Sequence, residues 1–168
     1  MNRRLILLRH AKSSWKDAGQ TDHERPLNRR GRESAPVVGA RLLELGWRPD
    51  AVWSSDAART VETWERMAEA LAAGDVPVRF TRDLYLAGLA DIRKLAGAWD
   101  DALETVLVLG HNPGWENAAS DLSGRSTEMT TANAALLSGR GATWNEALGG
   151  AWTLVDLVRP RDLMDGGA

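Results

Sequence analysis

The sequence contains no cysteine and only three histidines, at positions 10, 23 and 111. Without thiols, the chain can form neither disulfide bonds nor thiolate zinc sites, and it cannot use a cysteine nucleophile. A metal site built on imidazole ligands would need nearly all of the histidines. We therefore expect no metal site with cysteine or histidine ligands, and we also expect no cofactor.

Long apolar runs and a strong excess of charge of either sign are also missing. No run approaches the ~20 apolar residues of a membrane-spanning helix, and the apolar start Leu5–Leu8 is too short for a signal-peptide core. The formal net charge is -2 and the pI is about 5.9, which indicates neither nucleic acid nor an anionic membrane as partner. We expect a cytoplasmic protein in which any local basic patch suits a small anionic target.

Short apolar runs alternate with helical patterns along the chain. The length of 168 residues suits one domain, and we expect residues 1–168 to form it. Strand-like runs occupy residues 5–8, 51–53, 76–80, 105–109, 133–138 and 151–158, and helical spacing occupies residues 28–45, 57–73, 89–102 and 113–122. This alternation predicts an α/β fold, a three-layer sandwich around a mostly parallel sheet, with the last strand antiparallel at an edge.

Polar residues before three of the predicted helices are candidate caps. Asn28, Asp56 and Asn112 each directly precede a helical pattern, and their side chains can accept a hydrogen bond from a free amide at the helix start. Pro113 suits the first helical position, because proline has no amide hydrogen to leave unpaired there.

Other residues predict irregularities. Pro36 and Gly39 lie inside the first helical segment, where we expect a kink or a break. We expect a turn at residues 139–141 and a frayed tail at residues 166–168.

Cationic and imidazole side chains follow the ends of three predicted strands. Arg9 and His10 end the first strand. Arg59 lies in the first turn of a predicted helix, and His111 follows the most clearly buried strand. Each could be an ordinary surface or structural residue, but the carboxyl ends of parallel strands meet at one sheet edge, together with the helix N-termini that follow them. Such a gathering of positive groups predicts a site for a tetrahedral dianion such as a phosphoryl group.

Four segments have an order and spacing that are far more specific than any one of them. They are Leu7-Leu8-Arg9-His10-Ala11, Arg25-Pro26-Leu27 with Gly31, Ser54-Ser55-Asp56-Ala57-Ala58-Arg59-Thr60 and Val108-Leu109-Gly110-His111-Asn112-Pro113. Together they resemble the histidine phosphatase superfamily, whose fold is phosphoglycerate mutase-like. The Gly-His-Asn-Pro segment and the small size are most similar to the SixA-type phosphohistidine phosphatases.

The resemblance implies a histidine that is phosphorylated during the reaction, held among two core arginines and a second histidine. The residues at these catalytic positions are His10, Arg9, Arg59 and His111. The resemblance also implies that Arg25 and Asn112 contact the substrate.

Two features depart from the family pattern. Ala11 stands where most members have glycine after Arg-His. Many relatives place a glutamate after the third strand as proton donor, but the matching stretch 84–87 has no acid, and we assign that role to neither Asp83 nor Asp91.

The missing acid bears on the substrate. Neutral His10 would attack phosphorus in line, and water would then cleave the phosphohistidine. An alkoxide leaving group needs a proton donor, whereas a phosphohistidine substrate leaves as imidazole, whose conjugate acid has an unperturbed pKa of about 6.5. The pattern thus favours P–N over P–O substrates.

The leading hypothesis is a metal-independent phosphatase that removes phosphate from phosphohistidine in a partner protein. The alternatives are a phosphatase of small phosphate esters, such as sugar or nucleotide phosphates, and a non-catalytic phosphate-binding module, against which the intact His10 argues. A mutase is not favoured, since nothing in the sequence marks a bisphosphate pocket. Arg3, Arg4, Lys12 and Lys16 are expected near the mouth of the site, as solvated charges or as groups that steer an acidic partner.

Overall fold

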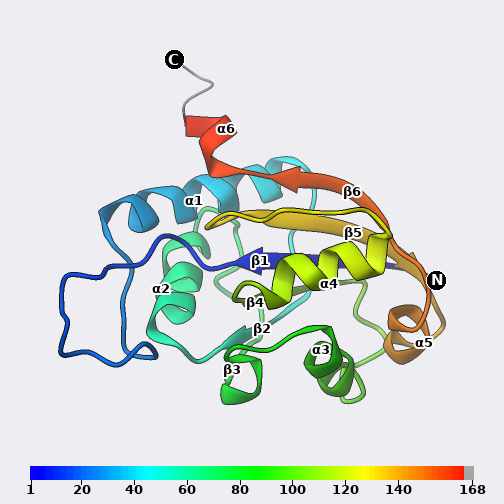
Figure 1. Cartoon of the computed structure of the whole chain (residues 1–168). Coiled ribbons are helices and arrows are strands. Elements are labelled where there is room, and N and C mark those ends of the chain that lie inside the picture. Colours follow the sequence, from blue (N-terminus) through cyan, green and yellow to red (C-terminus); the bar gives the residue numbers. More distant parts are fainter. Residues whose placement is uncertain (165–168) are drawn as a thin grey trace.

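A six-stranded sheet forms the middle layer of the computed structural model, which describes residues 1–164 (Figure 1). Its strands are β1 (Asn2–Arg9), β2 (Ala51–Ser55), β3 (Val78–Thr81), β4 (Thr105–Gly110), β5 (Ala134–Arg140) and β6 (Thr153–Val158). Their order across the sheet is β3-β2-β4-β1-β5-β6. Strands β1 to β4 are parallel, β5 is antiparallel to β1, and β6 is antiparallel to β5 at the edge. The predicted mostly parallel sheet with an antiparallel edge strand is confirmed.

Helices cover both faces of the sheet (Figure 1). Their bounds are α1 (Arg29–Glu44), α2 (Ala58–Met67), α3 (Leu89–Ala96), α4 (Gly114–Ser123), α5 (Trp144–Leu148) and α6 (Pro160–Met164), with a short 3-10 helix at Arg82–Leu84. Successive side chains of a strand point to opposite faces. Leu5 and Leu7 of β1 pack with α3, α4 and α5, whereas Ile6 and Leu8 pack with α1, α2 and α6. The three-layer sandwich follows directly from this alternation.

Strand β4 lies between β2 and β1, and all six of its residues are buried. A parallel strand covered on both faces needs a continuous apolar sequence, which is why residues 105–109 read as the clearest strand. At its end, a Cβ on Gly110 would lie 2.4 Å from the ring of Trp115, so the glycine makes room for this fully buried tryptophan. The Trp115 indole in turn donates to the carbonyl of Val108 at 3.0 Å.

Most of the tryptophans are packing residues. Successive ring contacts join Trp53 to Trp99, Trp99 to Trp144 and Trp144 to Trp152, with centroids 4.9 to 6.2 Å apart. They fill the layer between the sheet and the helices α3 to α5. Trp15 differs, because it is 77% exposed.

Helix α1 runs from residue 29 to residue 44 without the expected break at Pro36 or Gly39. The helix buries Ala35, Val38 and Leu42 against the sheet, and this packing outweighs the hydrogen bond that Pro36 cannot make. Gly39 instead lies where α1 meets α2. A Cβ at this position would lie 2.7 Å from the carbonyl oxygen of Met67, so glycine permits the close approach of the two helices.

The predicted caps have mixed outcomes. Asn28 caps α1 as expected, because its side chain accepts from the amide of Gly31 at 2.9 Å. The prediction for Asp56 is wrong: Ala57 is the N-cap of α2, and the Asp56 carboxylate pairs with His23 Nε2 at 2.7 Å. A side-chain partner from the neighbouring loop therefore takes the carboxylate away from the helix.

The start of α4 also differs from the prediction. The helix begins at Gly114, after a cis Asn112-Pro113 peptide, so Pro113 rather than Asn112 occupies the N-cap. The Asn112 side chain still accepts from a helix amide, that of Glu116, at 3.3 Å. Helices α2 and α3 end at residues 67 and 96, earlier than expected.

The carboxyl-terminal part differs most from the prediction. Gly139 and Arg140 continue β5 instead of forming a turn, because they pair with β1 down to its first residues. The short helices α5 and α6 were not predicted. The tail expected at residues 166–168 lies outside the described residues.

Arg3 is fully buried at the amino end of β1, far along the strand from the predicted site. Its guanidinium donates to the carbonyls of Asp101, Leu103, Gly141 and Ala142 at 2.6 to 3.2 Å. The expectation that Arg3 and Arg4 lie at the mouth of the site is therefore wrong. Arg3 therefore links the loops around residues 101–103 and 141–142 at the amino end of β1.

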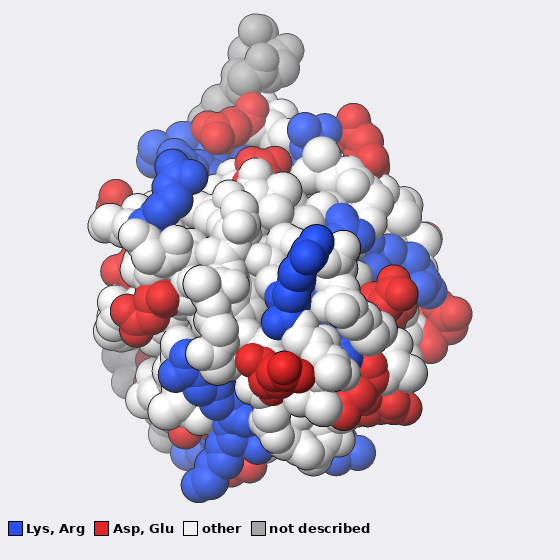
Figure 2. Space-filling model, turned by 90° about the vertical axis from the view of Figure 1, so that its right-hand side faces the viewer, with Lys and Arg blue, Asp and Glu red and all other residues white. Residues whose placement is uncertain are grey.

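Figure 2 shows the face of the molecule at the amino end of β1. Basic and acidic side chains are interspersed there around an uncharged area, and neither sign dominates. Among residues 1–164, none of the helices has the length and apolar character needed to cross a membrane.

Candidate active site

A cleft of about 530 Å³ opens at the carboxyl end of the parallel strands. The structure places all of the predicted site residues in its lining: Arg9, His10, Arg25, Arg59, His111 and Asn112. They come from the ends of β1 and β4, the first turn of α2 and the loop before α1. Residues that are about 100 positions apart in the sequence thus meet because β1 and β4 are parallel neighbours.

His10 directly follows β1 and is held rigidly. Its amide donates to the carbonyl of Gly110 at 3.0 Å, and the next amide, of Ala11, donates to the Thr63 hydroxyl at 3.0 Å. The ring nitrogen Nδ1 lies 2.7 Å from the carbonyl oxygen of Ala11. A carbonyl can only accept, so Nδ1 carries the hydrogen. In the neutral ring, Nε2 then has the free lone pair that a nucleophile requires.

His111 lies beside His10, with ring centroids 5.3 Å apart. Its Nε2 is 2.8 Å from the hydroxyl of Ser55, the last residue of β2, and its ring meets Tyr85 edge-on at 5.5 Å. Three strands therefore fix the relative positions of the two imidazoles.

Both imidazoles are held in the neutral form. Burial removes the His10 ring from water and, reinforced by the charges of neighbouring arginines, lowers its pKa from 6.5 to about 3. Burial and then the proximity of His10 and Arg59 lower the pKa of His111, also to about 3. At neutral pH, His10 can therefore attack an electrophile without first losing a proton.

Three arginines contribute positive charge to the cleft. Arg9 donates through Nη1 to the carbonyl of Met129 at 3.0 Å, and Arg25 packs against the exposed ring of Trp15 at 3.7 Å. Arg59, only 3% exposed, donates to the backbone carbonyl of Asp22 at 2.7 Å. Arg25 and Arg59 are each held through both terminal nitrogens of the guanidinium.

The sequence did not point to two further residues of the site, Asp22 and Tyr85. The Asp22 carboxylate bridges Arg25 and Arg59, at 2.9 and 3.0 Å, and accepts from the Tyr85 hydroxyl. The Tyr85 hydrogen bond and the two arginines hold the pKa of Asp22 well below its usual range, so this carboxylate is ionised and is a poor proton donor. A possible signal was that Tyr85, the single tyrosine, lies in the stretch where relatives carry their acid.

Several buried donors of the cleft have no partner within the protein. Of the five buried side-chain polar atoms without a hydrogen bond in the described part of the chain, four belong to this site: Arg9 Nε, Arg25 Nε, Arg59 Nε and His111 Nδ1. Buried donors normally find acceptors, and leaving one unpaired costs roughly 1–3 kcal/mol. Three guanidinium donors and one imidazole nitrogen without a partner, all on residues that line one cleft, therefore fit a site for an oxyanion.

Asn112 lines the cleft, but its amide hydrogens are already used. They donate to the carbonyl of Met129 at 2.7 Å and to the Glu116 carboxylate at 3.0 Å. Its expected contact with substrate stays a prediction. Lys12 and Lys16 do line the cleft, as expected.

The lowered pKa values predict how stability depends on pH. The unfolded chain takes up a proton on each histidine near pH 6.5, whereas the folded site resists protonation until about pH 3. The free energy of unfolding should therefore be highest above pH 6.5 and fall between pH 6.5 and about 3, by roughly 1 kcal/mol per pH unit for each of the two residues. Urea unfolding at pH 7.0 and 5.5 measures this slope.

His10→Ala provides the comparison, because the cavity that it leaves destabilises the protein equally at both pH values. The variant should lose less stability than the wild type between pH 7.0 and 5.5. Equal slopes in the two proteins would contradict the assignment of a neutral, buried His10.

Comparisons with known proteins identify the family and the fold of this chain. The profile of the histidine phosphatase superfamily (branch 1) matches residues 5–87. A chloroplastic, uncharacterized protein of Arabidopsis thaliana is 41% identical over 172 residues, which cover 95% of this chain and 79% of the relative. Since that relative is named as chloroplastic, the expected cytoplasmic location stays a prediction.

Solved structures of SixA proteins share the fold. The one from Agrobacterium tumefaciens, described as a candidate phosphohistidine phosphatase, is 27% identical with a TM-score of 0.79, over 94% of this chain and 98% of the other. The one from Nakamurella multipartitia, described in the same way, is 28% identical with a TM-score of 0.80, over 95% and 97% of the two chains. The profile match and the shared fold show that the chain belongs to the histidine phosphatase superfamily.

Proposed function

We propose that this protein is a phosphatase that works through a phosphohistidine on His10 and removes phosphate from phosphohistidine in a partner protein. One observation carries the proposal: a neutral imidazole with its Nε2 lone pair free stands in a cleft lined by arginines whose buried Nε donors have no partner. A phosphoryl group supplies both the electrophile for Nε2 and the acceptors for those donors.

In the first step, the Nε2 lone pair of His10 forms a bond to phosphorus while the bond between phosphorus and the leaving group breaks. A leaving imidazole keeps the electron pair of that bond and takes a proton from solvent. In the second step, water bonds to phosphorus, releases a proton to solvent, and the P–Nε2 bond breaks with its electron pair returning to His10. Arg9, Arg59 and His111 stabilise the equatorial oxygens in both transition states. These groups supply the positive field, so the proposed reaction requires no metal ion.

The lack of a proton donor among the described carboxylates of the cleft supports a substrate with a P–N bond. Asp22 is the one carboxylate in the lining formed by the described residues, and its lowered pKa keeps it ionised. A site without a strong acid suits a leaving group that departs readily, as imidazole does, better than an alkoxide. The descriptions of the two similar SixA proteins point to the same substrate class.

A phosphatase of small phosphate esters is the second candidate. The cleft volume of about 530 Å³ lies within the range of small-molecule sites and supports this alternative.

A substrate panel separates the candidates. We expect kcat/KM for a phosphohistidine protein and for phosphoramidate to exceed that for a sugar phosphate by about 100-fold or more, the usual contribution of a general acid that the ester would need. Faster hydrolysis of the ester would favour the second candidate. Binding of phosphate without turnover of any substrate would favour a non-catalytic module.

A further inference from the structure

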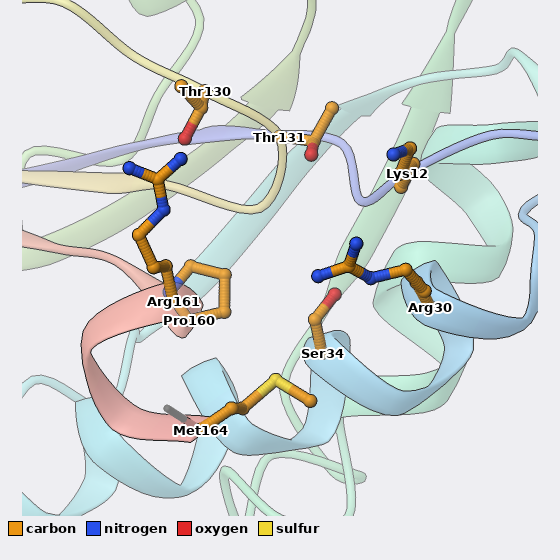
Figure 3. Close-up of a pocket in the computed structure, with 8 residues that line it drawn as sticks. All are labelled: Lys12, Arg30, Ser34, Thr130, Thr131, Pro160, Arg161 and Met164. Carbon is orange, nitrogen blue, oxygen red and sulfur yellow. The ribbon is translucent and has the colours of Figure 1, made fainter. Parts of the chain in front are cut away.

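A second pocket, of about 220 Å³, lies beside the candidate active site (Figure 3). Its walls come from α1, from α6 and from the segment that precedes β5. Lys12 and Thr131 line both this pocket and the active-site cleft, so the two hollows are neighbours. We call it the α1–α6 pocket.

The α1–α6 pocket is cationic. Lys12, Arg30 and Arg161 line it, and no carboxylate does among the residues that the structure describes. Figure 3 shows the guanidinium groups of Arg30 and Arg161 on opposite sides of the space, with the Lys12 amine and the Thr131 hydroxyl toward it. By contrast, the neighbouring Arg29 pairs with Glu33 at 3.0 Å. In a chain of net charge -2, three cations around one hollow indicate an anionic ligand.

The topology fixes the pocket next to the site. β6 is antiparallel to β5, which is antiparallel to β1, so β6 ends at the same sheet edge as β1. α6 follows immediately and is anchored by the buried Pro160 and by Leu163, which packs against the core beneath α1. Arg161 is therefore carried to its position by a packed element.

We propose that the α1–α6 pocket binds a second oxyanion, a carboxylate or a phosphate, on the same substrate whose phosphoryl group binds at His10. This inference rests on the proposed function and adds a specificity element to it. Two guanidiniums and an ammonium match the oxygens of either group, and the volume is ample, since one water molecule takes about 30 Å³ of liquid. No sequence pattern indicates a second anion site, because Lys12, Arg30 and Arg161 are brought together only by the fold.

The test uses the double variant Arg30→Gln/Arg161→Gln and, as matched control, Arg29→Gln, which removes an exposed charge from the same helix outside the pocket. One series compares kcat/KM for phosphohistidine peptides with acidic and with neutral neighbours. The other compares calorimetric affinities for a sugar bisphosphate and a sugar monophosphate, with the His10→Ala substitution added so that nothing is hydrolysed. The first series tests protein carboxylates as the source of the second anion, and the second tests a phosphate.

We expect the wild type to favour the doubly anionic ligand of one series roughly tenfold, mainly through KM or Kd. The double variant should lose this preference while it turns over neutral peptides as the wild type does, and Arg29→Gln should keep the preference. No preference in either series, or a preference that the double variant retains, would overturn the inference. If no peptide is turned over but the bisphosphate preference depends on Arg30 and Arg161, the proposed phosphohistidine substrate is wrong and the second anion site is still supported.

Discussion

Replacing His10 by alanine is expected to abolish phosphoryl transfer, with a loss of at least about 10³-fold in kcat/KM. The reason is that no other group in the cleft offers an equivalent lone pair: the His111 ring faces Ser55, and the Asp22 carboxylate is held by two arginines. Steady-state turnover of phosphoramidate measures the loss. Inorganic phosphate should still bind to the variant, because the arginines remain.

His23→Ala is the matched control for this prediction. His23 is partly exposed and pairs with Asp56 at 2.7 Å, and it is not part of the cleft lining. Its loss should leave kcat/KM within a few fold of the wild type. Comparable activities for His10→Ala and the wild type would show that His10 is not the nucleophile.

Replacing Arg59 by glutamine is expected to lower kcat/KM by about 10³-fold, the size of effect found for an arginine that stabilises a phosphoryl-transfer transition state. Arg59 is almost fully buried beside His10 and His111, and its Nε has no partner. Arg59→Lys should restore little activity, since an ammonium cannot offer the planar fork of donors. The measurement is kcat/KM for phosphoramidate together with phosphate affinity.

Arg66→Gln removes the same charge from the same helix, α2, at an exposed position 3.5 Å from Glu62. This control should behave as the wild type. If folded Arg59→Gln kept its activity within tenfold of the wild type, the stabilising role assigned to Arg59 would be wrong.

Local sequence signals were sufficient for the centre of the fold. The continuous apolar run of β4 and the apolar run of β1 both indicated strands that are covered on two faces. Once these two were parallel neighbours, His10 and His111 had to lie at the same sheet edge. The site could thus be predicted from strand ends and from the four family-like segments.

Individual side-chain contacts between loops that are distant in sequence could not be predicted. Asp56 precedes a helical pattern, as a capping residue does, but its carboxylate pairs with His23, which lies in a loop 33 residues away. Asp22 and Tyr85 meet across 63 positions, and nothing in either segment alone indicates the other. Arg3 reads as a terminal surface charge, yet the carbonyls of loops near residues 101 and 141 enclose it.

The short terminal elements show the same limit. Helix α6 has only five residues, too few for a periodic pattern, and its position is set by Pro160 and Leu163 packing near α1. The α1–α6 pocket exists only because this helix packs there. The α1–α6 pocket therefore depends on tertiary structure and could not be predicted from local sequence.

Identifying the phosphorylated residue tests the proposed mechanism most directly. The protein should be quenched during turnover of phosphoramidate and the phosphoenzyme located by peptide mapping and by ³¹P and ¹⁵N NMR. We expect one phosphoryl group, on Nε2 of His10, because Nδ1 donates to the Ala11 carbonyl. A phosphoryl group on another residue, or turnover without any phosphoenzyme, would contradict it.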